Sequence, residues 1–284
     1  MQRSIKIIIA MVLFASVPLV ADEKHMQWLE TLPKPWLVQP QELATILPEF
    51  RERFPDYQQR LKAIALWRLG TPYKIFNLGE ETEPDLDPIF RLDVSDCTSH
   101  VLTSISLAQS NNWQSARENL IQLHYKPDDL GNIKPDYKKR WHYTSDRLLH
   151  NSITPEITSR FATPEQLQTV TVTLNQKQDG SEFLDLNWTK QVTIRYIPSN
   201  EISSKLLDKL PNFIGLAFVK KSFFKMGIIT AHEGMLLDGK YLLHAGQSAK
   251  QTVKEDFMTY YFTPNGPKFD GVMLYEFKPF IENS

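Results

Sequence analysis

The single cysteine of the chain, Cys97, stands in the stretch Ser95-Asp96-Cys97-Thr98, whose residue types are typical of the start of a helix. Ser95 or Asp93 is expected to cap the free backbone N–H groups there. A cysteine in the first turn lies at the positive end of the helix, which favours the thiolate and lowers the pKa of the thiol. The position suits a nucleophile that has a base beside it; a buried, inert thiol is the alternative.

Seven histidines could supply that base. His100 lies on the same predicted helix as Cys97, so a substrate could not sit between the two side chains. His232 and His244 are better placed, because the segment between them is predicted to form a strand, an Asp238-Gly239 turn and a second strand. This hairpin is therefore the candidate carrier of the base.

The turn decides how the two histidines face each other. A two-residue Asp238-Gly239 turn would put His232 and His244 on opposite faces of the hairpin. A three-residue loop, Leu237-Asp238-Gly239, would place them directly across from each other, within reach of an imidazole–imidazole hydrogen bond. In that register His232 could accept the proton of Cys97 while His244 orients His232. Two structural histidines on one hairpin remain the alternative.

Other kinds of site find little support. One cysteine allows neither an internal disulfide nor a multi-thiolate zinc site, and His232-Glu233-Gly234 does not match the H-E-x-x-H zinc motif. No metal site is predicted. The 11 glycines form no G-x-G-x-x-G or Walker-type loop, so no nucleotide cofactor is expected. Lysine and arginine number 32 against 33 acidic residues, and this net charge of −1 argues against nucleic-acid binding.

The elements that must position these residues follow from periodicity. Apolar residues at three-to-four spacing predict helices over 40–69, divided at Pro48 and Pro55, and over 95–107. The acidic segment 77–88 is expected to be a surface loop. Alternating or β-branched stretches predict strands over 169–174, 182–188, 191–197, 213–219, 226–237, 241–244 and 271–277. Helices followed by antiparallel strands indicate an α+β fold.

The chain of 284 residues, 42% hydrophobic and 23% charged, has the composition of a folded protein. Residues 1–21 resemble a secretory leader, with Arg3 and Lys6 before a short apolar run and small residues before Asp22. Because that run is shorter than the roughly 18–20 residues that span a bilayer, we expect cleavage after Ala21, with an uncleaved anchor as the alternative. The rest, 22–284, is expected to be one weakly acidic, monomeric domain, periplasmic or secreted, without a stable membrane anchor.

Four motifs occur in order along the chain: Leu69-Gly70-Thr71-Pro72-Tyr73, then Asp96-Cys97-Thr98, then Ala231-His232-Glu233-Gly234, then Leu243-His244-Ala245. Together they resemble the NlpC-type papain-like cysteine peptidases of cell-wall turnover. The strings at 141–146, 196–198 and 242–248 more narrowly resemble the N-acetylmuramoyl-L-alanine-amidase-like branch of that superfamily. The resemblance spans about 61–277, and the chain departs from the branch at Arg147, where an aromatic residue is frequent.

The resemblance implies a papain-like core in which Cys97, at a helix N-terminus, packs on an antiparallel sheet that carries both histidines. It implies Cys97 as nucleophile, His232 as base and His244 as the orienting residue. A strand-rich insertion at about 164–222 is expected to line one wall of the cleft.

The resemblance also implies that Tyr73 and Asp96 shape the substrate pocket. We expect Thr98 and Tyr143 to contact substrate as well; the ring of Tyr143 could stack on a sugar, with placement in the core or on the surface as the default alternative. Asp146 could contact a sugar or an amine, but Thr144-Ser145-Asp146 also fits a helix start, and we favour the cap.

The function implied is an exported cysteine amidase that hydrolyses the N-acetylmuramoyl–L-alanine bond of peptidoglycan through a thioester, with no metal or organic cofactor. The alternatives are an endopeptidase that cuts the D-glutamyl–diaminopimelate bond of the stem peptide and a non-catalytic wall-binding protein.

Overall fold

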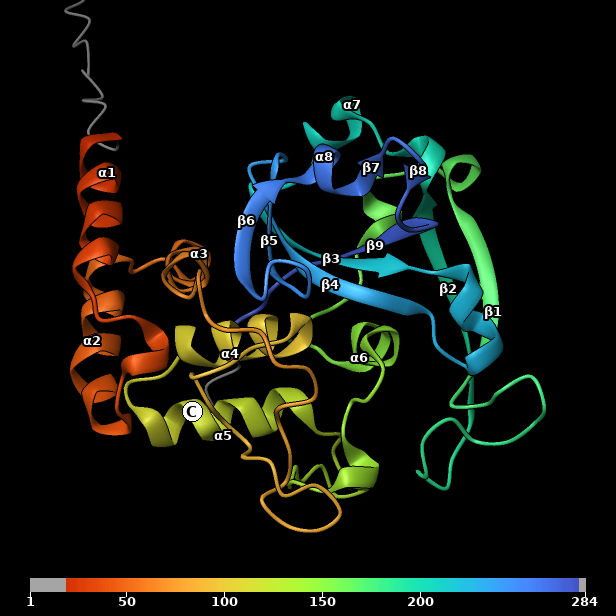
Figure 1. Ribbon diagram of the computed structural model, residues 1–284, viewed down its shortest axis with the longest axis horizontal. Helices are drawn as coiled ribbons and strands as arrows, with labels where there is room; N and C mark the ends of the chain where they lie inside the picture. Colours follow the sequence, from red (N-terminus) through yellow and green to blue (C-terminus); the bar gives the residue numbers. More distant parts are fainter. Residues whose placement is uncertain (1–18, 281–284) are drawn as a thin grey trace, which may run out of the picture. The chain divides into compact units, whose positions relative to one another are not determined.

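The computed structural model describes residues 19–280, which divide into two units at Leu32 and Pro33 (Figure 1). The first unit contains helix α1 (Leu19–Trp28) and a short 3-10 turn (Leu29–Thr31). The predicted leader lies outside the described residues except for its last three, which begin α1. Within 19–280, no helix combines the length and apolar character needed to cross a bilayer.

The second unit begins with helices. They are α2 (Leu43–Arg53), α3 (Tyr57–Trp67), α4 (Cys97–Ala108), α5 (Trp113–His124) and α6 (Thr144–His150), with the short α7 (Ser204–Leu207) and α8 (Phe257–Tyr261) further on. Pro55 separates α2 from α3 as predicted, but Pro48 lies inside α2, where the prediction of a break is wrong. The buried side chains of Leu43, Leu47 and Phe50 hold that helix in the core despite the lost backbone hydrogen bond.

The strands of the second unit form one antiparallel sheet within the described residues, in the order β1-β2-β9-β3-β4-β5-β6. They are β1 (Gln168–Leu174), β2 (Lys190–Pro198), β3 (Phe213–Val219), β4 (Thr230–Leu237), β5 (Tyr241–Gly246), β6 (Gln251–Asp256) and β9 (Gly271–Tyr275). A small hairpin, β7 (Phe262–Thr263) and β8 (Gly266–Pro267), lies apart from it. The predicted α+β class with an antiparallel sheet is confirmed.

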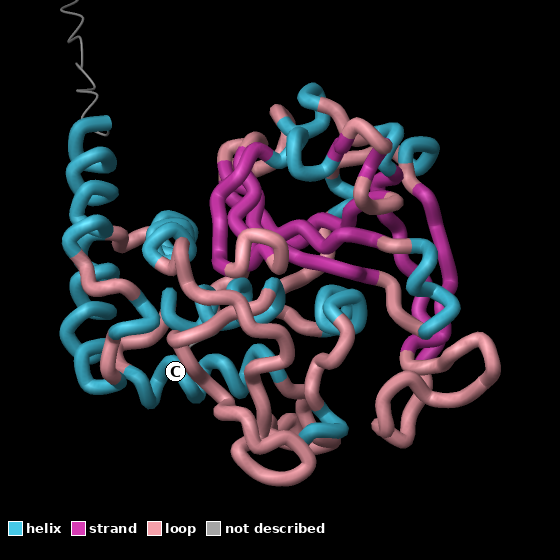
Figure 2. The backbone as a smooth tube through the Cα atoms, viewed as in Figure 1, coloured by secondary structure: helices cyan, strands magenta, loops and turns pink. Residues whose placement is uncertain are grey.

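Helices cover both faces of the sheet. Helices α4 and α5 lie on one side, and α7, α8 and the β7–β8 hairpin lie on the other (Figure 2). The second face is closed by a large apolar cluster that includes Leu216, Phe218, Leu242, Phe257 and Tyr261. Because α4 packs against both β4 and β5, its first residue is brought close to those strands.

Some strand predictions need correction. Residues 182–188 form a loop instead of a strand, because side chains satisfy its backbone: the amide of Asn175 bonds to Leu184 and Trp188, and the carboxylate of Glu182 accepts the N–H groups of Leu186 and Asn187. The strand predicted over 226–237 begins only at Thr230, since Lys221–Met226 forms a 3-10 helix.

The segment 164–222 contributes to two parts of the sheet. It supplies β1 and β2 at one edge, but it also supplies β3, which lies between β9 and β4 in the middle.

Candidate active site

Cys97 is the first residue of α4, and Asp96 caps that helix. The carboxylate of Asp96 accepts the N–H of Ser99 at 2.8 Å, and the Ser99 hydroxyl accepts the N–H of Asp96 at 2.8 Å. The prediction that Ser95 or Asp93 caps the helix is wrong. The Ser95 hydroxyl is buried against Arg68, and Asp93 forms an ion pair with Arg91.

The Cys97 thiol is not activated by the helix terminus in the way that the sequence led us to expect. Its pKa is raised to about 12, because burial disfavours the thiolate and the carboxylates of Asp96 and Glu233 lie near it. Hydrogen bonds from the Glu233 backbone and the Thr98 side chain act in the opposite direction. At neutral pH the sulfur is therefore protonated and needs a base.

The sulfur lies at the place where two strands separate. Strands β4 and β5 pair only from Met235 with Leu243 to Leu237 with Tyr241. Beyond that ladder, Glu233 lies near the thiol of Cys97 and contributes to its pKa shift. His232, the candidate base, is the residue that precedes Glu233 on β4.

The hairpin of the two histidines has a register that neither prediction anticipated. Leu237 pairs with Tyr241 around the loop 238–240, in which Asp238 and Gly239 are both left-handed, with φ of +52° and +60°. The N–H of Asp238 donates to the carbonyl of Asn212 at 2.7 Å, a contact with a distant segment that helps fix the loop.

This register makes His232 and His244 diagonal neighbours on one face of the sheet. Extended by one residue pair, it sets Gly234 opposite His244, and a β-carbon at Gly234 would lie 3.0 Å from Cβ of His244. The absence of a side chain at Gly234 thus leaves the space across which the two imidazoles meet.

A continuous chain of hydrogen bonds joins the histidines to a carboxylate. Nε2 of His232 lies 2.7 Å from Nδ1 of His244, and Nε2 of His244 lies 2.6 Å from Oε1 of Glu255 on β6. A carboxylate only accepts hydrogen bonds, so Nε2 of His244 carries a proton and its Nδ1 accepts. The proton between the rings then belongs to Nε2 of His232, which leaves a free lone pair on Nδ1 of that ring while both imidazoles are neutral.

Burial keeps both imidazoles neutral. It lowers the pKa of His232 to about 3, with smaller contributions from His244 and Lys268. Burial also lowers the pKa of His244, although the Glu255 carboxylate opposes that shift. The resting pair is accordingly a neutral thiol and a neutral imidazole.

Aromatic residues that the sequence did not single out cover the two histidines. The ring of Tyr260 lies 4.7 Å from that of His244 and 6.1 Å from that of His232, between ring centroids. The ring of Phe269 stacks over His232 at 6.3 Å, and the ammonium of Lys268 lies 3.9 Å from the centroid of Tyr260. The polar sequence of β6, with Val253 as its one apolar residue, does not predict a strand that would carry Glu255, and nothing local marks Tyr260 as part of the site.

The carboxylate of Glu233 is fully buried and accepts four hydrogen bonds. Thr98 on α4 donates at 2.8 Å, Thr144 on α6 at 3.0 Å, Arg147 on α6 at 2.5 Å and Tyr275 on β9 at 2.9 Å. Arg147, which departs from the resembled branch, is the buried counter-ion of this carboxylate. The residue after the candidate base thereby fixes α4 and α6 against the sheet.

The structure brings most of the predicted site residues together. Tyr73 forms a bridge with Ser95, and burial, followed by the charges of Cys97 and Asp96, raises the pKa of its phenol, so it lies at the thiol. Thr98 is beside the sulfur, with its hydroxyl directed to Glu233. The candidate His100 is buried on α4.

The remaining candidates lie elsewhere. Tyr143 is buried, donates to Asn175 at 2.7 Å and packs its ring on Trp188. Asp146 lies in the first turn of α6 but makes no capping bond, so the predicted cap is wrong; it forms ion pairs with Lys126 and Lys190 instead.

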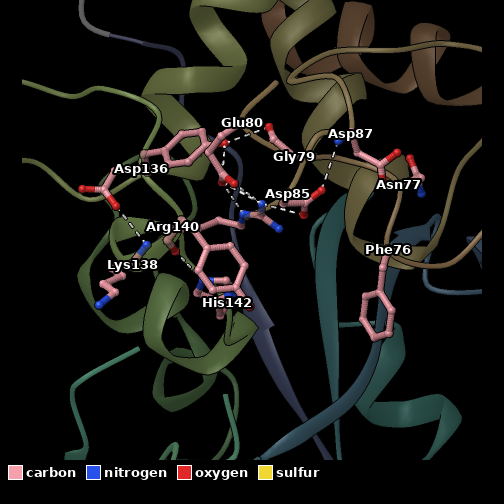
Figure 3. Close-up of polar contacts among 12 residues, drawn as sticks. Phe76, Asn77, Gly79, Glu80, Asp85, Asp87, Asp136, Lys138, Arg140 and His142 are labelled. Atoms are coloured by element: carbon pink, nitrogen blue, oxygen red, sulfur yellow. Dashed lines mark hydrogen bonds and ion pairs between the residues drawn. The ribbon is translucent and has the colours of Figure 1, made fainter. Parts of the chain in front are cut away.

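A polar cluster fixes the loop 77–88, whose first residues are buried although a surface loop was predicted. Arg140 donates to Glu80 at 2.7 Å and to Asp85 at 2.9 Å (Figure 3). Clefts of about 500 and 660 Å³ lie nearby, around Lys126 and Trp188 and around Glu83 and Asp136, but neither is lined by Cys97, His232 or His244. Among residues 19–280, no group of three or more His, Cys, Asp or Glu side chains could hold a metal ion.

Comparisons with known proteins identify relatives. A family model described as N-acetylmuramoyl-L-alanine amidase-like matches residues 63–266. No curated protein matches the chain by sequence.

Solved structures share the fold at low sequence identity. A protein from Legionella pneumophila is 18% identical with a TM-score of 0.66, covering 83% of this chain and 94% of that one. An N-acetylmuramoyl-L-alanine amidase from Bacteroides uniformis is 18% identical with a TM-score of 0.58, covering 78% of this chain and 99% of that one.

The Glu233 carboxylate yields a stability prediction. Glu233→Gln leaves the Arg147 guanidinium buried without a counter-charge, so the free energy of unfolding should fall by about 3–5 kcal/mol in urea denaturation. Tyr275→Phe, which removes one donor and should still fold, is expected to cost about 1 kcal/mol. The control Glu276→Gln, in a more exposed ion pair with Arg160, should cost less than about 1 kcal/mol. Equal losses for Glu233→Gln and the control would contradict this role.

Proposed function

The chain belongs to the N-acetylmuramoyl-L-alanine amidase-like family, and from this premise we propose that it hydrolyses the amide bond between N-acetylmuramic acid and L-alanine in peptidoglycan fragments. The observation that carries the proposal is the hydrogen-bond chain from His232 through His244 to Glu255, which begins on β4 one residue before Glu233, a neighbour of the Cys97 thiol. A thiol, a neutral base and a group that orients the base are the parts that nucleophilic amide hydrolysis needs. In the proposed site Cys97 is the nucleophile, and the fold is a papain-like core of the NlpC type.

The first half-reaction forms a thioester. Nδ1 of His232 takes the thiol proton as the sulfur attacks the carbonyl carbon of the lactoyl group on the muramic acid. The tetrahedral intermediate collapses when the C–N bond breaks, and the imidazolium returns the proton to the departing amine of L-alanine. The backbone N–H of Cys97, at the start of α4, is our candidate donor to the oxyanion.

The second half-reaction restores the enzyme. Nδ1 of His232 takes a proton from water, whose oxygen attacks the thioester carbon, and the C–S bond breaks as the sulfur regains the proton. His244 and Glu255 stabilise the imidazolium that forms in each half-reaction and hold its ring in one tautomer. All of these proton transfers use side chains of this chain.

Tyr73 and Asp96 are the proposed residues that shape the substrate pocket, because both lie at the thiol. The hydroxyl of Thr98 is engaged by Glu233, and that of Tyr143 by Asn175, so in this proposal they position other elements. The peptidoglycan substrate and the predicted leader together support an exported protein.

Product analysis tests the proposed bond. The purified protein, incubated with defined disaccharide-peptide fragments, should release free disaccharide and an intact peptide in mass spectrometry, and Cys97→Ala should release neither. A disaccharide that retains L-Ala-D-Glu would move the cut to the stem peptide, as expected of the endopeptidase. No cleavage of any fragment would contradict the enzyme and favour a wall-binding protein.

The pH dependence of kcat/KM tests whether the Cys97 thiol and the His232 imidazole are both neutral at rest. His232 must be neutral to accept the proton, and its pKa of about 3 keeps it neutral through weakly acidic pH. Because the Cys97 thiol stays protonated up to a pKa of about 12, kcat/KM should vary less than about twofold between pH 5 and 8. Initial rates measured across this pH range give kcat/KM, and circular dichroism verifies that the protein stays folded. An acid limb near the ordinary imidazole pKa of about 6.5 would contradict it.

The same assay uses variants to test the relay, by which we mean the hydrogen-bond chain from His232 through His244 to Glu255. Glu255→Gln should lower kcat roughly tenfold and His244→Ala roughly a hundredfold, because the imidazolium loses its stabilising partners. The control Lys254→Ala, next to Glu255 with its ammonium over Tyr241, should leave kcat unchanged. Full activity of both relay variants would contradict a role for His244 and Glu255.

A further inference from the structure

Phe76 is an exposed aromatic residue in an unfavourable backbone conformation. Its side chain is 81% exposed, and its φ of +51° lies in the left-handed region that residues with a β-carbon rarely adopt. The neighbouring Ile75 is 50% exposed. Neither property helps the fold, since the ring is not packed in the core and glycine or asparagine would fit the backbone better.

The conformation of Phe76 is held by the residue that caps the Cys97 helix. Oδ2 of Asp96 accepts the N–H of Phe76 at 3.1 Å, while Oδ1 accepts the N–H of Ser99. The next residue, Asn77, donates to the carbonyl of Lys74 at 2.6 Å and closes the turn. The backbone of Phe76 is therefore held, through the Asp96 carboxylate, next to the residue that precedes Cys97.

The ring does not belong to the polar cluster of the same loop. In Figure 3 the side chain of Phe76 points away from Glu80, Asp85 and Arg140. The backbone bond to Asp96 would form with any residue at this position except proline. An isolated exposed aromatic is common on protein surfaces; a strained one, fixed by the cap of the proposed nucleophile, is a candidate for ligand binding.

We infer that Phe76 is a platform on which the apolar face of a sugar ring of the substrate stacks, beside the bond that Cys97 attacks. The inference rests on the proposed function, in which the acyl group that joins the sulfur carries the muramic acid. A flat aromatic face that is open to solvent matches the C–H face of a pyranose, whereas the stem peptide next to the bond offers only the methyl group of L-alanine.

The test compares two substrates that share the amide bond. One is a disaccharide-peptide, and the other is the same peptide acylated with D-lactate, which has no sugar. Phe76→Asn suits a left-handed backbone, so it should fold with an unchanged or higher Tm. It should raise KM for the disaccharide-peptide by about fivefold to tenfold, with kcat changed less than twofold and KM for the lactoyl-peptide unchanged. Phe76→Trp should restore KM.

A matched control separates this effect from a general loss of exposed aromatic surface. Phe183, 38% exposed on the loop between β1 and β2, should give unchanged kinetics when replaced by asparagine. Equal changes of KM for both substrates, or no change for either, would overturn the platform.

A binding measurement keeps this inference separate from the proposed chemistry. If the wild-type protein cleaves neither substrate, the proposed function fails, and the platform is then tested by calorimetry of the disaccharide-peptide with Cys97→Ala. Binding weakened about fivefold or more by adding Phe76→Asn supports the platform. Unaltered binding overturns it.

Discussion

The carboxylate of Glu233 is buried where no water can solvate it, and the groups that donate hydrogen bonds to it come from three separate elements. Thr98 belongs to the helix of Cys97, Arg147 to α6 and Tyr275 to β9. Loss of the counter-ion Arg147 would cost several kcal/mol and loss of a neutral donor about 1 kcal/mol, so the elements are held in one arrangement. Since Thr98 follows Cys97 on α4 and donates to Glu233, that arrangement holds the start of α4 against the strand that carries His232.

The same burial sets the protonation of the site. A thiol that faces Asp96 and Glu233 holds its proton, and an imidazole enclosed by aromatic rings does not gain one. In the proposed mechanism, charge separation occurs only when a substrate arrives and the sulfur attacks. His244 and the negative charge of the half-exposed Glu255 would then stabilise the imidazolium of His232. The protein thereby avoids a reactive thiolate at rest.

Local patterns sufficed for the α+β class, the helix that begins at Cys97 and the hairpin of the two histidines, because periodicity and turn residues encode them. The hairpin register was not predictable, since it depends on two left-handed residues and on a bond from Asp238 to the distant Asn212. Glu255 was missed because β6 was not predicted as a strand. The thiol pKa was misjudged because the helix terminus is visible in sequence, while burial and the proximity of Glu233 arise only in the folded chain. Tyr143 was predicted to contact substrate because the sequence does not show that its ring packs on Trp188 and its hydroxyl donates to Asn175.

The central claim is that the Cys97 sulfur becomes acylated by the sugar-bearing side of the substrate. Rapid acid quenching of the protein with a disaccharide-peptide, followed by intact-mass and peptide-level mass spectrometry, tests it most directly. The account predicts a transient mass increase equal to the disaccharide with its lactoyl group, located on Cys97. A label on another residue, or an adduct that retains amino acids of the stem peptide, would contradict it.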